Sequence, residues 1–266
     1  MHWFWKALRR LTFTLLVKAA ACGIGIVLLA GFSVPLVPKT DALPRYVVER
    51  VCGDIVIDGY LSEESWRRAA TMGNFVLSDG SGVPQSTTRA TMLWDSTYLY
   101  VGFECYDTDI IATMKKRDSK LWEEEVVELF LAPSAPEQRG YTEIEISPLN
   151  TVLDLYVREV RGTMPIALPY STYNLSIRSA VHVRGTPNIS TDTDTLWTVE
   201  IALPLEELQL VNLPPIADGD VWNVNLYRIE RFPRRELIAW SPTMQNKFHV
   251  PSRFGSVLFS MKQVGK

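Results

Sequence analysis

The chain has 266 residues, of which 47% are hydrophobic, and its 27 basic and 30 acidic side chains give a net charge of −3. A chain of this length and composition can bury a sizeable core in one large domain or two small ones. No Lys- or Arg-rich tract follows the N-terminal segment, so the sequence lacks the basic patch with which proteins bind nucleic acid. Its three cysteines and three histidines exclude a zinc cluster with ordinary ligand spacing.

Residues 1–41 have the order of an export signal. Three basic side chains among the first ten residues precede an apolar run, in which residues 19–37 carry no charge and are long enough to cross a bilayer. Two interpretations remain open: a signal peptide that is removed, or an anchor that stays in the membrane with its basic end in the cytoplasm. Both predict that residues 42–266 form an exported domain, which is secreted, periplasmic or anchored to the cell envelope.

Beyond residue 41 the hydrophobic pattern predicts short strands separated by turns. Alternating or β-branched runs indicate strands over residues 46–51, 55–57, 87–94, 98–105, 126–131, 141–147, 151–157, 174–183, 196–203, 221–230, 238–240 and 254–259. Ser62 is placed to cap a short helix that carries Trp66 onto the sheet, and residues 204–208 predict a helical turn. With roughly ten or more strands and no long amphipathic helix, the fold class is all-β: a single antiparallel β-sandwich, jelly-roll-like, with short helical turns.

One predicted strand carries a carboxylate where the pattern calls for an apolar side chain. Along residues 126–131, Val126, Glu128 and Phe130 share one face. A buried carboxylate needs hydrogen-bond donors, from the protein or from a ligand. Trp122 lies just before this strand, and a flat aromatic ring beside a carboxylate suits the binding of a sugar. The alternative is a core tryptophan and a Glu128 that pairs with an arginine elsewhere.

A later strand carries two asparagines on one face. Asn223, Asn225 and Tyr227 alternate along residues 221–230, and asparagine is depleted in strands. The pattern predicts a polar surface that faces a ligand.

Four stretches of the chain carry motif residues in a fixed order. They are residues 55–66 (IVIDGYLSEESW), 93–101 (LWDSTYLYV), 121–130 (LWEEEVVELF) and 249–255 (HVPSRFG). In this order and spacing they resemble a family 9 carbohydrate-binding module, across about residues 46–260. The resemblance implies a β-sandwich that grips the end of a sugar chain between two aromatic rings and is not itself a catalyst.

The resemblance also implies roles for particular residues. Trp122 matches one of the two stacking rings, and Phe248 lies near the position of the second. Glu128 matches a carboxylate that accepts hydrogen bonds from sugar hydroxyls. Asn225 lies at an amide position on a late strand.

The chain departs from the family at one donor position. Glu145 stands where sugar-binding members have an arginine, and Arg228 is the predicted substitute. Family members also hold structural calcium. Asp107, Asp109 and Asp118 offer suitable ligand chemistry, and the alternative for these three residues is a solvated acidic loop.

The predicted function is that of an exported, non-catalytic carbohydrate-binding protein that takes part in polysaccharide recognition or catabolism beside a glycoside hydrolase. Its predicted partner is a sugar chain, and an uncleaved leader would also bind the protein to a membrane. Two other classes stay open: an envelope scaffold or adhesive sandwich, and a haem-binding relative of the fold. Haem would need axial ligands from His182, His249, Met92 and Met244.

An enzyme is the third alternative. A glycosidase needs two carboxylates that flank the scissile bond, and Glu128 could provide one. Glu143 and Glu145 share a face of the strand over residues 141–147 and could provide the other. The non-catalytic character of the resembling family argues against this alternative.

Two cysteines lie outside the leader, Cys52 and Cys105. Export allows a disulfide between them.

Overall fold

In the computed structural model of the chain, the described residues are 42–265, apart from 74, 133–139, 163, 170, 171 and 210–215. All of them belong to the unit Lys39–Lys266. The expected signal or anchor segment, residues 1–41, therefore lies outside the described residues. Within the described part of the chain, no helix is long and apolar enough to cross a membrane.

Strands dominate the described residues, which confirms the all-β class. In chain order they are β1 (Arg45–Val51), β2 (Val76–Leu77), β3 (Thr88–Trp94), β4 (Tyr98–Tyr106), β5 (Val126–Ala132), β6 (Tyr141–Ile146), β7 (Val152–Arg161), β8 (Met164–Ala167), β9 (Arg178–Arg184), β10 (Leu196–Pro204), β11 (Val221–Glu230), β12 (Glu236–Ala239) and β13 (Gly255–Val264). The helices are short: α1 (Glu64–Arg68), α2 (Leu205–Gln209) and the 3-10 turns η1 (Leu121–Glu123) and η3 (Pro251–Arg253).

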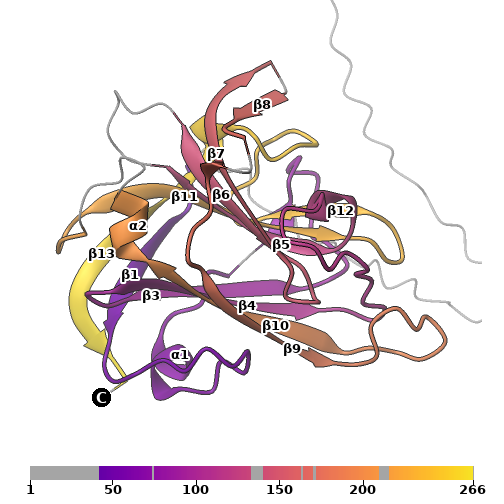
Figure 1. Cartoon of the computed structure of the whole chain (residues 1–266), viewed down its shortest axis with the longest axis horizontal. Helices are drawn as coiled ribbons and strands as arrows, with labels where there is room; N and C mark the ends of the chain where they lie inside the picture. The colour runs from indigo at the N-terminus through magenta and orange to yellow at the C-terminus, as the bar shows by residue number, and fades with distance from the viewer. Residues whose placement is uncertain are drawn as a thin grey trace, which may run out of the picture. The chain divides into compact units, whose positions relative to one another are not determined.

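The strands join one sheet that folds into two layers. Its order is β8-β7-β6-β5-β11-β13-β1-β3-β4-β10-β9, and β12 pairs with β11 and β2. Figure 1 shows β5, β6, β7 and β11 in one layer and β1, β3, β4, β10 and β9 in the other. The strand β13 joins the layers because it pairs with β11 on one side and β1 on the other.

The prediction of a purely antiparallel sandwich is wrong at β1. This strand runs parallel to both of its neighbours, β13 and β3. Parallel neighbours need a crossover connection, and the segment that contains α1 and β2 provides it between β1 and β3. Hydrophobic alternation is the same for both strand directions, so the sequence pattern does not reveal this pairing.

The main core lies between the two layers and is built by alternation along the strands. On β5, Val127, Leu129 and Leu131 are buried in this core. Trp197 on β10 and Trp222 on β11 are among its largest fully buried side chains. Burial of each such side chain stabilises the fold by roughly 1.5–3 kcal/mol.

The segment before α1 is held by one buried carboxylate. The predicted strand at residues 55–57 is wrong, because these residues form no ladder. Instead, the backbone N–H groups of Asp58 and Gly59 donate to Glu200 Oε2 at 2.8 and 2.7 Å, and Trp66 Nε1 donates to Glu200 Oε1 at 2.8 Å. Glu200, on β10, thereby ties the opening motif to the sheet.

The helix α1 follows this segment and lies outside the layer of β3, β4 and β10 (Figure 1). Its N-cap is Glu63, without a side-chain capping bond. The predicted Ser62 cap is therefore wrong. Trp66 packs with Leu93 and Tyr100 in a small apolar cluster, as predicted for a helix that rests on the sheet.

We expect Gly59→Ala to lower the free energy of unfolding by about 2–4 kcal/mol. Gly59 has a φ of +89°, and a Cβ there would lie 2.8 Å from backbone atoms of Val181 and His182 on β9. The matched control is Gly53→Ala, since Gly53 has a φ of +97° with open space around its Cβ position, and it should cost only about 1 kcal/mol. Urea denaturation measures both values, and equal losses would contradict the predicted contact with β9.

The predicted disulfide is wrong, because Cys52 and Cys105 are both free thiols. Cys105 pairs with Thr88 at the start of β3, whereas Cys52 follows β1, whose Arg50 pairs with Trp94 at the end of β3. The length of β3 separates these positions by about 20 Å. A disulfide requires Cα atoms no more than about 7 Å apart.

Candidate functional site

A second apolar cluster covers the face of β5, β6 and β11 that points away from the main core. Its large members are Phe130, Tyr141, Tyr227, Phe248 and Phe254. The first three come from the strands, and the last two come from the segment that precedes β13. The strand β5 therefore has buried side chains on both of its faces, because the segment that carries Phe248 and Phe254 covers its outer face.

Three carboxylates lie on this outer face, and we call Glu128, Glu143 and Glu145 the acidic triad. Glu128 pairs directly with Glu145 across β5 and β6, and Glu143 lies two residues along on the same face. One oxygen of each lies within 4.8 Å of the other two. Their exposed fractions are only 3%, 3% and 1%. The predicted burial of Glu128 and the shared face of Glu143 and Glu145 are thus confirmed.

Burial sets the electrostatics of the acidic triad. It raises the pKa of Glu128, of Glu145 and of Glu143, the last to about 8. Repulsion among the carboxylates adds to the raised pKa of Glu128 and Glu145. The positive charge of Arg235 lowers the pKa of Glu128, but its effect is smaller than that of burial.

The histidine beside the acidic triad is neutral at pH 7. His249 Nδ1 lies 3.8 Å from Glu143 Oε2 and 2.5 Å from the Tyr141 hydroxyl oxygen. Its ring stacks on Phe130 with 5.4 Å between centroids. Burial, with a smaller contribution from Lys247, lowers the pKa of His249 to about 4. The imidazole therefore adds no positive charge beside the acidic triad.

Trp122 lies beside the acidic triad, in η1 immediately before β5. This is the loop position at the strand mouth that the sequence predicts. Its side chain is half-buried and packs against the second apolar cluster. Its backbone N–H donates to the carboxylate of Glu145, which fixes the tryptophan relative to β6.

Two further predicted residues share this face but are engaged within the protein. The Phe248 ring stacks on Tyr227 at 4.1 Å between centroids. Asn225 is fully buried, and its amide nitrogen donates to the Tyr227 hydroxyl at 2.7 Å and the Ser241 carbonyl at 2.8 Å. Its carbonyl oxygen accepts from the backbone of Leu226 and Ser241. In this structure both residues pack the face, and their contact with a sugar stays a prediction.

Arg228 does not lie on this face, so its predicted role as the substitute donor is wrong. Residues three positions apart on a strand point to opposite faces. The fully buried guanidinium of Arg228 lies over Trp197 in the main core. It donates to Asp107 Oδ2 at 2.8 Å, to the carboxylate of Glu230 and to the Tyr106 carbonyl at 2.9 Å.

The residues predicted as calcium ligands do not form a common site. Asp107 belongs to a second group of three carboxylates, with Glu125 and Glu230, in which Arg228 already provides a cation. Burial, then repulsion by Asp107 and Glu230, raises the pKa of Glu125 to about 10, so this carboxyl is protonated at neutral pH. Asp109 and Asp118 belong to neither group, and the predicted calcium set does not fit.

The geometry also bears on two alternatives raised by the sequence, a glycosidase and a haem-binding protein. A retaining glycosidase holds its carboxyl groups about 5–5.5 Å apart with the sugar between them, whereas one oxygen of each triad carboxyl lies within 4.8 Å of the other two. The candidate haem ligands lie in different places: Met92 in the main core, His182 against Tyr60 on β9, and His249 on the outer face of β5.

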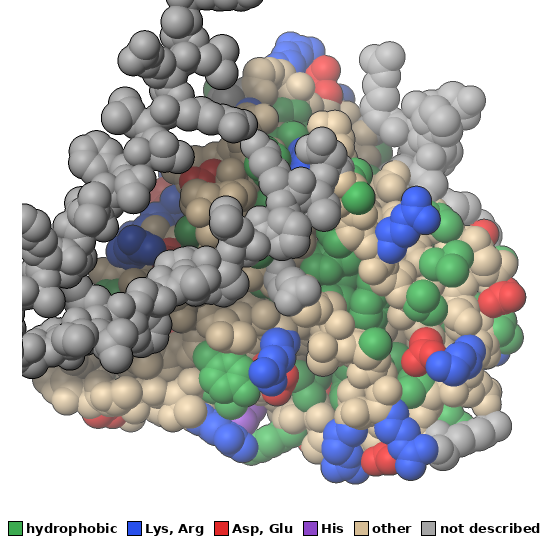
Figure 2. Space-filling model, turned by 180° about the vertical axis from the view of Figure 1, so that it is seen from behind, with side chains coloured by type: hydrophobic (Ala, Val, Ile, Leu, Met, Phe, Trp, Pro, Cys, Tyr) green, Lys and Arg blue, Asp and Glu red, His purple; other side chains and the backbone are tan. Residues whose placement is uncertain are grey.

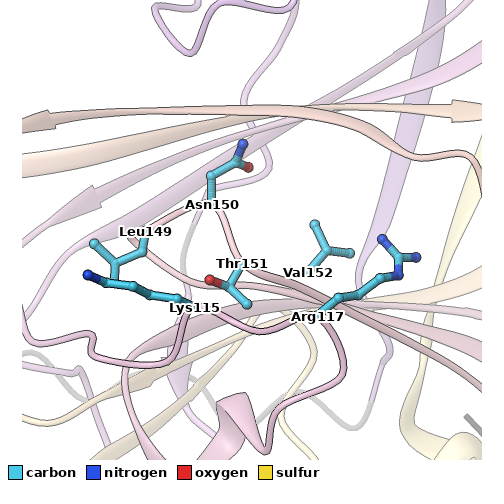
Figure 3. Close-up of a pocket in the computed structure, with 6 residues that line it drawn as sticks. All are labelled: Lys115, Arg117, Leu149, Asn150, Thr151 and Val152. Carbon is cyan, nitrogen blue, oxygen red and sulfur yellow. The ribbon is translucent and has the colours of Figure 1, made fainter.

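Two hollows on the described surface lie away from these residues. One of about 260 Å³ is lined by Lys115, Arg117, Leu149, Asn150, Thr151 and Val152 (Figure 3). Figure 3 shows Lys115 and Arg117 pointing in opposite directions, and Arg117 is bound to Asp154. The other, of about 220 Å³, lies beside Trp66. The first hollow has no aromatic lining on which a sugar could stack.

The face drawn in Figure 2 shows no large patch of charge of one sign among the described residues. Figure 2 shows basic and acidic side chains interspersed with hydrophobic ones on one face. This fits the absence of a basic tract in the sequence.

Comparison with known proteins identifies the family. A model described as "Carbohydrate family 9 binding domain-like" matches residues 57–262. An extracellular protein of Arthroderma benhamiae is 26% identical over 187 residues, which cover 68% of this chain and 81% of that protein.

Two solved structures of a family 9 module from Caldicellulosiruptor kristjanssonii share the fold. The complex with cellotriose is 16% identical, has a TM-score of 0.53, and covers 82% of this chain and 95% of that one. The complex with glucose is 17% identical and has a TM-score of 0.51, and the match covers 82% of this chain and 97% of that one. With the family model matched over most of its length, this chain belongs to the carbohydrate family 9 binding domain-like family.

Proposed function

We propose that this chain is a carbohydrate-binding module that acts without covalent chemistry, at the face that carries Trp122 and the acidic triad. The observation that carries the proposal is the half-buried Trp122 beside the acidic triad, held by its backbone bond to Glu145, and the sequence resemblance matches this residue to a stacking ring. The two related modules with cellotriose and glucose bound add support.

The proposed contacts follow from the chemistry of a pyranose ring. The exposed part of the Trp122 ring would cover the apolar C–H face of the sugar, and Glu128 would accept hydrogen bonds from its hydroxyl groups. The positive charge of Arg235 lowers the pKa of Glu128, whereas Arg228 lies on the other face of the sheet. We therefore assign to Arg235 the role of hydrogen-bond donor to the sugar, which the carboxyl of Glu145 does not fill.

We further propose that the protein is exported and recognises polysaccharide beside a glycoside hydrolase. The apolar run over residues 19–37 and the extracellular relative support export. A scaffold or adhesive role in the envelope is the other candidate, and the sugar titration below separates the two.

We expect Trp122→Ala to abolish measurable sugar binding, because the stacking surface is lost. The test is intrinsic tryptophan fluorescence of the full chain titrated with glucose, cellotriose and a panel of other oligosaccharides. The matched control is Tyr60→Ala, which removes another partly exposed ring that stacks on His182 of β9, and which should bind like the wild type.

A saturable change that survives Trp122→Ala would place the sugar elsewhere. No response to any sugar, from wild-type protein with a cooperative unfolding transition, would refute the proposal and favour the scaffold role.

A further inference from the structure

Two arginines lie opposite each other in the loop that joins β11 to β12. The last paired residues of this hairpin are Glu230 and Glu236, so Arg231 and Arg235 come next on the two arms. Like charges that oppose each other in this way destabilise a hairpin. Burial, and then repulsion by Arg231, lower the pKa of Arg235 accordingly. Among the described residues neither guanidinium has a carboxylate within 4.0 Å, whereas Arg234 between them pairs with Glu236 at 3.0 Å.

Both arginines extend the face of the sheet that carries the acidic triad. Ile229 on β11 and Leu237 on β12 pair with each other and pack in the second apolar cluster. Arg231 and Arg235 each lie two positions further along, where the alternation of side chains returns to the same face. Burial raises the pKa of Glu128 and the charge of Arg235 opposes this, so the guanidinium lies near the triad.

The same end of this face carries Trp122. The strand β11 pairs with β5 as far as Val126, the first residue of β5, and η1, which contains Trp122, lies immediately before that strand. Burial raises the pKa of Glu124, but hydrogen bonds from Thr113 and then the charge of Arg231 lower it overall. Arg231 therefore acts on a residue two positions from Trp122.

The carboxyl groups around this end do not neutralise the two arginines. Three carboxyls within 4.8 Å of one another cannot all be ionised, and burial raises the pKa of each member of the acidic triad. Glu124 already accepts hydrogen bonds from the backbone N–H and the hydroxyl of Thr113. Lys247, which together with burial lowers the pKa of His249, adds a further positive charge.

We propose that the sugar bound at Trp122 is acidic, and that Arg231 and Arg235 together hold its carboxylate. A planar guanidinium matches a carboxylate with two parallel hydrogen bonds, and an anion between the two arginines removes their repulsion. The ligand class is an oligosaccharide that contains uronic acid. The glucose and cellotriose bound by the related modules carry no carboxylate. This inference rests on the proposed function and names its ligand.

The test compares two pairs of ligands that differ in a carboxylate: cellobiouronic acid with cellobiose, and trigalacturonic acid with its methyl ester. Calorimetric titration of the full chain at pH 7 should give, in at least one pair, a Kd at least about tenfold lower for the acidic member. Sodium chloride at about 0.5 M should reduce this preference.

Arg231→Gln and Arg235→Gln should each reduce the preference for the acidic member by at least about fivefold. The matched control is Arg234→Gln, which makes the same change of charge in the same loop, at an arginine that already pairs with Glu236. This variant should keep the preference within about twofold of the wild type.

Equal or tighter binding of the neutral member in both pairs would overturn this inference and leave the proposed sugar site standing. If neither acidic nor neutral sugars bind to folded wild-type protein, the proposed function is refuted and this inference with it. A preference for the acidic member that survives both Arg231→Gln and Arg235→Gln would also overturn it, because the carboxylate would then be held elsewhere.

Discussion

Replacement of Arg228 by alanine is expected to lower the free energy of unfolding by about 3–5 kcal/mol, because removal of one partner leaves buried charge uncompensated. The guanidinium of Arg228 is fully buried and binds the carboxylates of Asp107 and Glu230. Without it, three carboxyl groups share one enclosed space, since Glu125 lies in the same group. Urea denaturation followed by tryptophan fluorescence measures the loss.

Arg161→Ala is the matched control for this prediction. Arg161 also pairs with a glutamate, Glu159, but the two side chains are 72% and 45% exposed. Exposed ion pairs contribute about 0–1 kcal/mol, because water screens them. Similar losses in the two variants would contradict the distinction between buried and exposed pairs. Recovery of stability when Asp107→Asn and Glu230→Gln are added to Arg228→Met would identify the uncompensated charge as the cause.

Replacement of Glu200 by alanine is the second large effect, with an expected loss of at least about 3 kcal/mol, because each of three donors left unpaired costs about 1–3 kcal/mol. The donors are the backbone N–H groups of Asp58 and Gly59 and the indole of Trp66. Hydrogen exchange supplies a local readout, since the Asp58 and Gly59 amides should lose their protection. Denaturation gives the total loss.

Glu200→Gln separates the effect of the hydrogen bonds from that of the charge, because the glutamine amide keeps one acceptor oxygen. We expect this variant to lose roughly half as much stability as Glu200→Ala. Glu206→Ala, an exposed substitution on α2, should stay within about 0.5 kcal/mol of the wild type. Unchanged exchange at Asp58 in Glu200→Ala would show that another group holds this segment.

The sequence reveals which side chains of the site share a face of one strand, because side chains alternate along a strand. It predicts that Glu128 shares a face of β5 with Val126 and Phe130, and that Glu143 and Glu145 share one face of β6, and both placements are confirmed. The same rule separates Arg228 from Asn225, since an odd number of positions divides them. Alternation therefore excludes Arg228 from the face of Asn225, although the chemistry of its guanidinium suits the donor role.

Pairing between distant segments is the part that the sequence does not reveal. Glu128 faces Glu145 only because β5 and β6 pair in one register, and register depends on packing of the whole sheet. The bond between Trp66 and Glu200 joins positions 134 residues apart. No local pattern signals such contacts, so the motif residues around Trp66 could be recognised while the carboxylate that holds them could not.

The position of β13 between the layers has a consequence for the order of folding. Among the described strands, β1 has parallel partners in β3 and β13, and the backbone ladder between the layer of β5, β6 and β11 and that of β1 runs through β13. This ladder cannot form until β13, which follows the other described strands in the chain, has been synthesised. Sheets closed by such long-range pairings fold slowly, so we expect the joining of the two layers by β13 to be a late step in folding.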